Sequence, residues 1–352
     1  MHAPTGSLSL LVSLVCLVGV VPPDAAFGQA ETKPGAASIG EPVGAVERSR
    51  LRELAIDDLM QLASSEDPQV RANAIEGLIL APGRLEVVLP AALADPNEGV
   101  RTVAAMAVGR AEVEGVLSAV EPMVRDSSPY VRAAAIYALR KNGRDINPTP
   151  LGAMVTQDPS PRIRSHAAFL LGELGDKGTS SLLREAAKAK VIRATAAETK
   201  VLSVQIAEAL VKLGDNEQLH TIRAALYPAT PEELDATVLA VQVLGSLGDR
   251  ASIGQLQSLG SMRDSVGGRM PLEVRLAVAG TLGRLGVAVD LEEAARALAE
   301  GNEPNRIQAA WVFGETAGSG ALRALEGAMG EGSERVRVAV ASAMLKAAER
   351  TR

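Results

Sequence analysis

A short sequence template recurs along most of the chain and limits its fold more than any other feature. The template reads apolar, Arg, two variable residues, two small residues, one variable residue, an Ala-like residue and a Leu-like residue, as in the segment that starts at Val100. Nine copies follow one another at intervals of roughly 30–39 residues. A period of this length predicts stacked structural units rather than a domain with a single core.

Each copy has the periodicity of a helix that is buried on one side. With the first apolar residue as position 0 and about 100° per residue, positions 0, 4, 5, 7 and 8 share an arc of about 160°. That arc is almost wholly apolar, and positions 2, 3 and 6 lie opposite it. A second apolar segment precedes each copy, for example residues 85–94 and 113–124. The chain is therefore predicted to be all-α: an α-solenoid, coiled as a right-handed superhelix of about nine two-helix repeats.

The turns between these segments carry signals that start and end helices. Asp-Pro pairs at Asp67, Asp95 and Asp158 place a capping carboxylate beside a proline suited to the first helical turn. Gly-Asp pairs at Gly214 and Gly248 predict glycine at the C-terminal ends of helices. These signals flank the template copies, so they support the same two-helix repeat.

Together these residues resemble the HEAT repeat, in particular the short variety found in phycobilisome-lyase-type proteins. The pattern Asp-Pro…Val-Arg-x-x-Ala-Ala-x-x-Leu-Gly-x-Leu-Gly-Asp covers about residues 49–348. The resemblance implies the solenoid fold and a ladder of aspartates and arginines that ties neighbouring repeats together. It does not imply an activity, because HEAT arrays serve many unrelated roles.

The arginines of the template also suggest phosphate binding, but their place at the edge of the buried arc favours the structural ladder. Arginine at such an edge lies next to the helix N-terminus and to the aspartates of the turn. A guanidinium held there by carboxylates is costly to remove from one side. The predicted ladder residues are Asp67, Arg71, Asp95, Arg101, Arg132, Asp158, Arg164, Arg275, Arg306 and Arg337.

Residues 1–30 have the order of a secretory signal. An apolar run over residues 8–21 is followed by two prolines and then by small residues. Cleavage is expected near Gly28 to Ala30, because about 14 apolar residues are few for a membrane span of ~20; an uncleaved anchor is the alternative. Residues 31–48 are predicted to be a flexible linker. The protein is expected in the bacterial periplasm or cell envelope.

Charge and composition disfavour several classes of function. The net charge is −6, so the excess of cations that nonspecific nucleic-acid binding needs is missing. The single cysteine, Cys16, lies in the predicted signal, and His166 and His220 are the only histidines beyond that signal. The sequence also lacks the repeated His-Glu pairs of HEAT-like deoxyhypusine hydroxylases. We therefore predict no catalytic residue, no metal site and no cofactor.

An apolar stripe on the predicted inner helices is the main candidate for a partner site. Template position 6 should be exposed, yet it holds large apolar residues in several repeats. The second helix of a HEAT repeat lines the concave surface, so positions 3 and 6 together would form a stripe suited to a peptide or a partner helix. The alternative is that curvature buries these side chains between repeats. The candidate residues are Val103, Met106, Ala134, Tyr137, His166, Phe169 and Trp311.

A weaker candidate is a basic edge. Insertions in the turns inside the fifth and seventh repeats place cations on an acidic protein, which favours an anionic partner. Drift of tolerated loops is the alternative. The edge residues are Lys188, Lys190, Arg193, Lys200, Arg263 and Arg269.

The sequence thus favours a non-catalytic scaffold or adaptor that holds a peptide or a partner protein on its concave surface outside the cytoplasm. Two alternatives stay open at this point. One is a regulatory or sensor subunit of an envelope complex, and the other is a HEAT-like enzyme of the lyase type.

Overall fold

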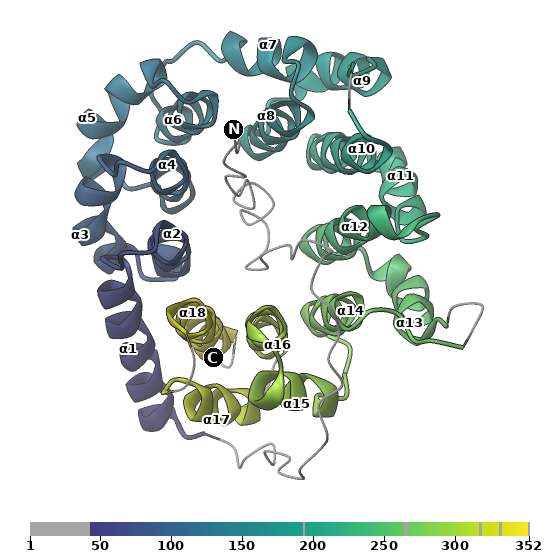
Figure 1. The fold of residues 1–352 in the computed structure, drawn as a ribbon. Coiled ribbons are helices and arrows are strands. Elements are labelled where there is room, and N and C mark those ends of the chain that lie inside the picture. Colours follow the sequence, from purple (N-terminus) through teal and green to yellow (C-terminus); the bar gives the residue numbers. More distant parts are fainter. Residues whose placement is uncertain (1–42, 193, 264–266, 317–318, 331–332, 351–352) are drawn as a thin grey trace, which may run out of the picture.

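The computed structural model describes residues 43–192, 194–263, 267–316, 319–330 and 333–350. Within these residues the chain forms eighteen α-helices and, apart from one isolated bridge between Arg263 and Arg269, no β-structure. Odd-numbered helices form an outer layer and even-numbered helices an inner layer (Figure 1). The predicted all-α solenoid of two-helix repeats is confirmed.

The inner helices carry the template copies. They are α2 (Pro68–Gly77), α4 (Glu98–Ala111), α6 (Pro129–Lys141), α8 (Pro161–Leu174), α10 (Ala196–Lys212), α12 (Leu234–Ser246), α14 (Leu272–Arg284), α16 (Glu303–Glu315) and α18 (Glu334–Arg350). The outer helices are α1 (Ala45–Leu62), α3 (Pro82–Leu93), α5 (Leu117–Val120), α7 (Thr149–Gln157), α9 (Ser180–Lys188), α11 (Leu219–Ala224), α13 (Ile253–Ser261), α15 (Glu292–Glu300) and α17 (Ser319–Ala328). Because α1 begins at Ala45, the end of the predicted linker is helical.

The helices begin near the predicted Asp-Pro signals, but in two of the three cases the capping residue is two positions later. Asp67 caps α2 directly, with a proline at the first helical position. Asp95 and Asp158 instead accept hydrogen bonds of 2.8 Å from the backbone N–H groups of Asn97 and Ser160. Asn97 and Ser160 are the residues that cap α4 and α8. The two aspartates therefore order the turn before each helix rather than the first helical turn itself.

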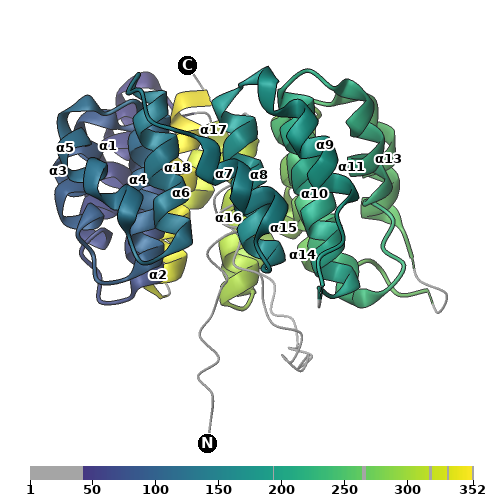
Figure 2. The same cartoon turned by 90° about the horizontal axis from the view of Figure 1, so that it is seen from above.

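The solenoid closes on itself into a ring. The inner helices are seen end-on in Figure 1 and side-on in Figure 2, so they run along the ring axis. α18 packs against both α1 and α2, which places the last repeat beside the first. The sequence predicted a superhelix, in which successive repeats climb past one another. The local pattern does not set the rotation between repeats, and here this rotation brings the ninth repeat back to the first.

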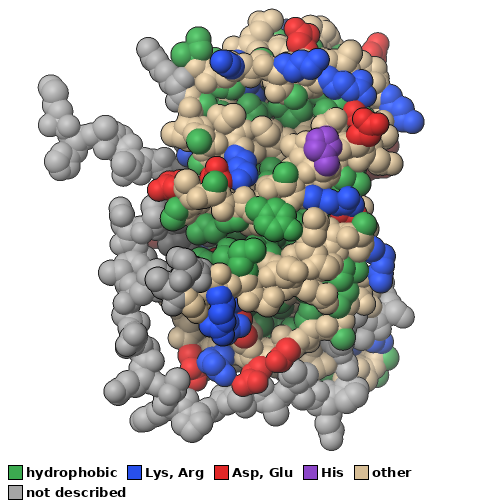
Figure 3. Space-filling view, turned by 90° about the vertical axis from the view of Figure 1, so that its right-hand side faces the viewer, with side chains coloured by type: hydrophobic (Ala, Val, Ile, Leu, Met, Phe, Trp, Pro, Cys, Tyr) green, Lys and Arg blue, Asp and Glu red, His purple; other side chains and the backbone are tan. Residues whose placement is uncertain are grey.

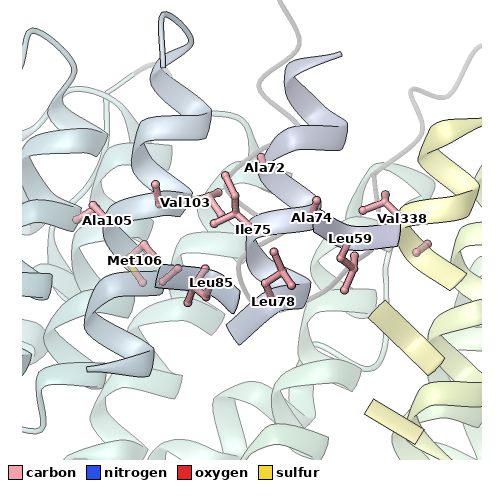
Figure 4. Packing of buried hydrophobic residues seen from close by; sticks show 14 of the residues in the cluster. Leu59, Ala72, Ala74, Ile75, Leu78, Leu85, Val103, Ala105, Met106 and Val338 are labelled. Atoms are coloured by element: carbon pink, nitrogen blue, oxygen red, sulfur yellow. The ribbon is translucent and has the colours of Figure 1, made fainter. Parts of the chain in front are cut away.

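Apolar side chains fill the seam where the ring closes. Leu59 of α1 and Val338 of α18 are fully buried and lie beside Ala74 of α2 (Figure 4). The terminal repeats of a solenoid normally need a polar outer face, because each would otherwise expose the surface that packs on a neighbour. In the ring each terminal repeat covers the other, so both terminal faces are apolar.

Ion pairs add to the seam. Arg52 of α1 lies 2.9 Å from Glu349 of α18, and the predicted ladder residue Arg337 pairs with Asp58 of α1. Asp67 pairs across the seam with Arg335, at 2.7 Å. The first and last repeats are thus joined by the kind of contact that joins consecutive repeats.

Candidate functional site: the central cavity

The predicted apolar stripe belongs to the core. Met106 and Tyr137 are each 1% exposed, and the exposure expected at template position 6 is wrong. His166, expected in solvent, is also buried. The whole stripe is buried: Val103, Met106, Ala134, Tyr137, His166, Phe169 and Trp311.

The reason is that each inner helix has an inner neighbour on both sides and an outer helix behind it. Tyr137 lies against Gly109 of α4, where an added Cβ would be 2.5 Å from the tyrosine Cε1 atom. Trp311 lies in the same way against Gly280 of α14. Helical periodicity shows which residues share a face, but it does not show whether a second helix covers that face.

His166 is a core residue in this arrangement. Burial lowers the pKa of His166 to about 4, so the imidazole is neutral near pH 7. Its ring meets the Tyr130 ring edge-on, with 5.5 Å between the centroids. The side chain therefore packs between α6 and α8 and does not face the centre of the ring.

The ring encloses a central cavity of about 490 Å³. Its wall comes from every inner helix except α6, and from Ile79 and Leu80, which follow α2. Of the predicted stripe, Phe169 and Trp311 contribute to this wall, and the other stripe residues do not. Cavities of roughly 300–1,000 Å³ are the size that holds small ligands or short chain segments.

A row of mostly charged residues runs along the inner helices, largely on the cavity face, and the template left it out. The row occupies position 10, one helical turn beyond position 6, whereas the template ended at position 8. An alignment of the repeats extended by two residues would have shown this row. In successive repeats position 10 holds Leu80, Arg110, Lys141, Glu173, Lys212, Ser246, Arg284, Glu315 and Lys346. All of these line the cavity except Lys141, which lines a separate pocket, and Glu315, which is fully buried.

One group of these charges lies on α8 and α10. The Lys212 ammonium is 2.6 Å from Glu173 and 2.6 Å from Glu208, and Glu208 is 1% exposed. Burial alone would lower the pKa of Lys212, but the two carboxylates outweigh burial and raise it. This side of the wall therefore carries two carboxylates and one cation.

A second group lies on α14, α16 and α18 around Glu315, whose side chain is fully buried. Lys346 is 2.5 Å from this carboxylate, Arg350 is 3.3 Å away, and Arg284 is 3.7 Å away. This side of the ring therefore carries three cations and one carboxylate. The excess of charge is opposite in sign to that on α8 and α10.

Phe169 lies under two cations of the cavity wall. The Lys212 ammonium is 4.8 Å from the centroid of its ring, and the Arg110 guanidinium is 5.7 Å away. Cations at such distances are attracted to the face of an aromatic ring. Phe169 thus supports the charged row as well as filling the core.

Glu76 on α2 is a carboxylate with weaker compensation. It is 14% exposed, and its nearest cation, Arg110, is 3.6 Å away. Burial raises the pKa of Glu76 to about 7, and the charges of Arg110 and Lys346 oppose this rise without cancelling it. The Glu76 carboxyl group therefore titrates near neutral pH.

Replacing Glu76 by glutamine is expected to change how stability depends on pH. The folded protein binds the Glu76 proton more tightly than the unfolded chain does, so the contribution of Glu76 to stability falls as the pH rises from about 4.5 to about 7. This fall should amount to roughly 2–3 kcal/mol. It is measured as the difference between wild type and Glu76→Gln, because buried His166 adds an opposite rise in stability to both proteins over the same pH range. Urea unfolding at pH 5 and pH 8 measures it, with exposed Glu292→Gln as the control. An equal pH dependence in wild type and Glu76→Gln would contradict the assignment.

Ladder arginines link consecutive repeats. Arg71 pairs with Asp95 at 2.7 Å, and Arg101 pairs with Asp126 at 2.9 Å; the template did not identify Asp126. Both arginines also donate through Nη1 to two carbonyl groups of the turn before their own helix. Each guanidinium therefore joins its own turn to the next. Three more donate to carbonyl groups before their own helices: Arg132 to Asp126, Arg164 to Asp158 and Arg306 to Leu298.

The predicted basic edge is partly neutralised. Lys200 lies 2.7 Å from Glu233, and Arg269 shares Glu293 with the ladder residue Arg275. These two cations are therefore engaged in ion pairs within the chain.

The other residues of this edge differ in their surroundings. Lys188 at the end of α9 and Lys190 just after it are exposed. Figure 3 shows basic side chains over the upper part of this outer face. Arg263 donates to the carbonyl group of Gly267 at 2.8 Å, and Arg193 lies outside the described residues. The edge is thus less basic than the sequence indicates.

The predicted signal at residues 1–30 and most of the predicted linker also lie outside the described residues. In the part that the structure describes, no helix combines the length and apolar character needed to cross a membrane. The same part contains no cluster of three or more His, Asp or Glu side chains placed to hold a metal ion.

Residues 85–151 match the family model of HEAT repeats. The chain carries HEAT repeats. The match runs from α3 to the start of α7, and the same two-helix unit continues on both sides of it. The resemblance drawn from the template is therefore confirmed. No curated protein matches the chain.

Solved structures of HEAT-like helical repeat proteins are similar to the HEAT-repeat ring. The complex of CpcE and CpcF of phycocyanin lyase from Nostoc sp. PCC7120 has 18% identity and a TM-score of 0.41, over 77% of this chain and 96% of that one. Human deoxyhypusine hydroxylase in complex with glycerol has 18% identity and a TM-score of 0.34, over 85% of this chain and 98% of that one. An engineered protein has 14% identity and a TM-score of 0.29, over 96% of this chain and 99% of that one.

Proposed function

We propose that this HEAT-repeat ring is a non-catalytic binding scaffold that acts outside the cytoplasm. Its partner is a peptide or a segment of a partner protein, held in the centre of the ring. Export rests on the order of residues in the N-terminal segment, and the scaffold role rests on the repeat architecture.

The observation that carries the proposal is the central cavity. Closure of the solenoid turns its concave surface into the wall of a cavity of about 490 Å³, to which Phe169 and Trp311 contribute. A wall that combines apolar surface with fixed charges matches the usual composition of a binding site. The charged groups are held in two clusters, one around Lys212 and one around Glu315. The proposed contact site is therefore at position 10 rather than at the buried stripe.

A photo-cross-linking amino acid at Leu80 tests this site. Leu80 lines the cavity and is 41% exposed, so the substitution leaves the core intact. Val87 of α3 is 67% exposed on the outer layer and is the matched control. Irradiation in cells should give cross-linked partners from the Leu80 position that are absent from the Val87 position. The same partners from both positions, or none from Leu80, would contradict binding in the cavity.

A further inference from the structure

Charge is distributed unevenly around the central cavity. On one side, Arg284, Lys346 and Arg350 surround the single carboxylate of Glu315. On the α8 and α10 side, one ammonium, that of Lys212, lies between two carboxylates. These two groups of helices lie on opposite sides of the ring (Figure 1). The first side therefore has an excess of cations, although the whole chain has a net charge of −6. On the second side the Arg110 guanidinium, 5.7 Å from the centroid of the Phe169 ring of α8, offsets the second carboxylate.

The cations of the positive side are accessible. Glu315 is fully buried, whereas the side chains of Lys346 and Arg284 are 35% and 34% exposed. Both also line the cavity. Each cation thus contacts Glu315 while about a third of its side chain stays exposed. A guanidinium has five N–H donors and an ammonium three, so both retain donors for a second anion.

We infer that the side of the cavity formed by α14, α16 and α18 is an anion subsite that binds a carboxylate group of an acidic peptide segment. This inference rests on the proposed function and names the chemistry of the segment. Trp311 of α16 lies in the same part of the wall and supplies apolar contact for the segment beside the charge.

Another account of these cations is that they offset the partial negative charge at helix C-termini. Arg284 ends α14 and Arg350 ends α18, and cations are stabilising there. That account predicts an effect of these arginines on stability and none on the affinity for an acidic peptide. Affinity and stability must therefore be measured separately.

The fluorescence of Trp311, the only tryptophan of the chain, reports binding in the cavity. The probes are three eight-residue peptides in which serine alternates with glutamate, glutamine or lysine, together with inorganic phosphate. The glutamate peptide should bind at least tenfold more tightly than the glutamine peptide, and added salt should weaken it. The lysine peptide should bind more weakly than either.

Two substitutions of opposite sign test the subsite. Arg284→Gln should weaken binding of the glutamate peptide about tenfold, because a cation facing the cavity is lost. Glu315→Gln should strengthen that binding, because the resident carboxylate no longer competes for the three cations. Lys188→Gln, on the outer edge, should change neither. Thermal unfolding of each variant shows whether it is folded, and a purely structural role would lower stability in both variants without this opposite effect on affinity.

The outcomes separate the two proposals. Equal affinity for the glutamate and glutamine peptides, or no effect of Arg284→Gln, would overturn the anion subsite while leaving peptide binding in place. Phosphate that binds as tightly as the glutamate peptide would overturn the assignment to an acidic segment. No response of Trp311 to any peptide, together with equal cross-linking at Leu80 and Val87, would overturn the proposed function itself.

Discussion

Replacing Tyr137 by glutamate is expected to unfold the ring. The side chain is 1% exposed and lies against Gly109 of α4. The substitution removes a large aromatic group from the core, which by itself costs about 3–5 kcal/mol. It also buries a carboxylate, which adds a further desolvation cost. Burial raises the pKa of Tyr137 to about 12, and the negative charges of Glu173 and Glu112 add to this rise. The same effects would oppose a new carboxylate.

Circular dichroism and urea unfolding measure the effect of Tyr137→Glu. Tyr137→Phe keeps the ring of the side chain and should cost less than about 1.5 kcal/mol. Tyr227→Glu, at a tyrosine that is 49% exposed, should have little effect. A folded Tyr137→Glu protein with wild-type stability would show that this part of the stripe is open to solvent after all.

Cysteines placed at Ser65 and Glu334 are expected to cross-link within one molecule. The Ser65 hydroxyl donates a hydrogen bond to Glu334 across the seam, although the two residues are far apart in the sequence. In a Cys16→Ser background, a short bismaleimide should therefore join them efficiently at low protein concentration. A faster-migrating band on a denaturing gel is the readout. The pair Ser65→Cys and Lys188→Cys, on different sides of the ring, is the matched control and should not react.

Val338→Asp is expected to abolish that cross-link by opening the seam. Val338 is fully buried beside Leu59 of α1, and an unpaired carboxylate there costs several kcal/mol. Each remaining repeat still has its neighbours, so most helix should persist while the first and last repeats separate. Small-angle X-ray scattering should then show a larger radius of gyration. An unchanged cross-linking yield would show that the apolar seam does not hold the ring closed.

The two substitutions separate local packing from closure. Tyr137 lies between consecutive inner helices, where the repeat pattern already required contact. Val338 of the last helix, α18, faces the first two helices, α1 and α2, and nothing in the local pattern required these helices to be in contact. Loss of the seam should also remove the cavity, because α2, α16 and α18 all contribute to its wall. Binding in the centre of the ring therefore depends on closure.

Local signals in the sequence were enough to predict the helices. The period of the template, the capping aspartate at Asp67 and the glycines after α10 and α12 act over a few residues. Gly214 and Gly248 adopt φ angles of 102° and 68°, as helix C-terminal glycines do. Such effects depend on the chain near each residue, so the sequence alone determined an all-α array of two-helix repeats.

The tertiary structure alone decided which faces are buried and what surrounds the cavity. Template position 6 looked exposed because a helical wheel shows one helix, whereas Tyr137 is covered by the helix before it. Position 10 acquired its role because the small rotations between repeats add up to a closed ring, which directs Lys212 and Lys346 to a common centre. The total rotation depends on every contact between repeats, so the sequence of a single repeat cannot show that the ring closes.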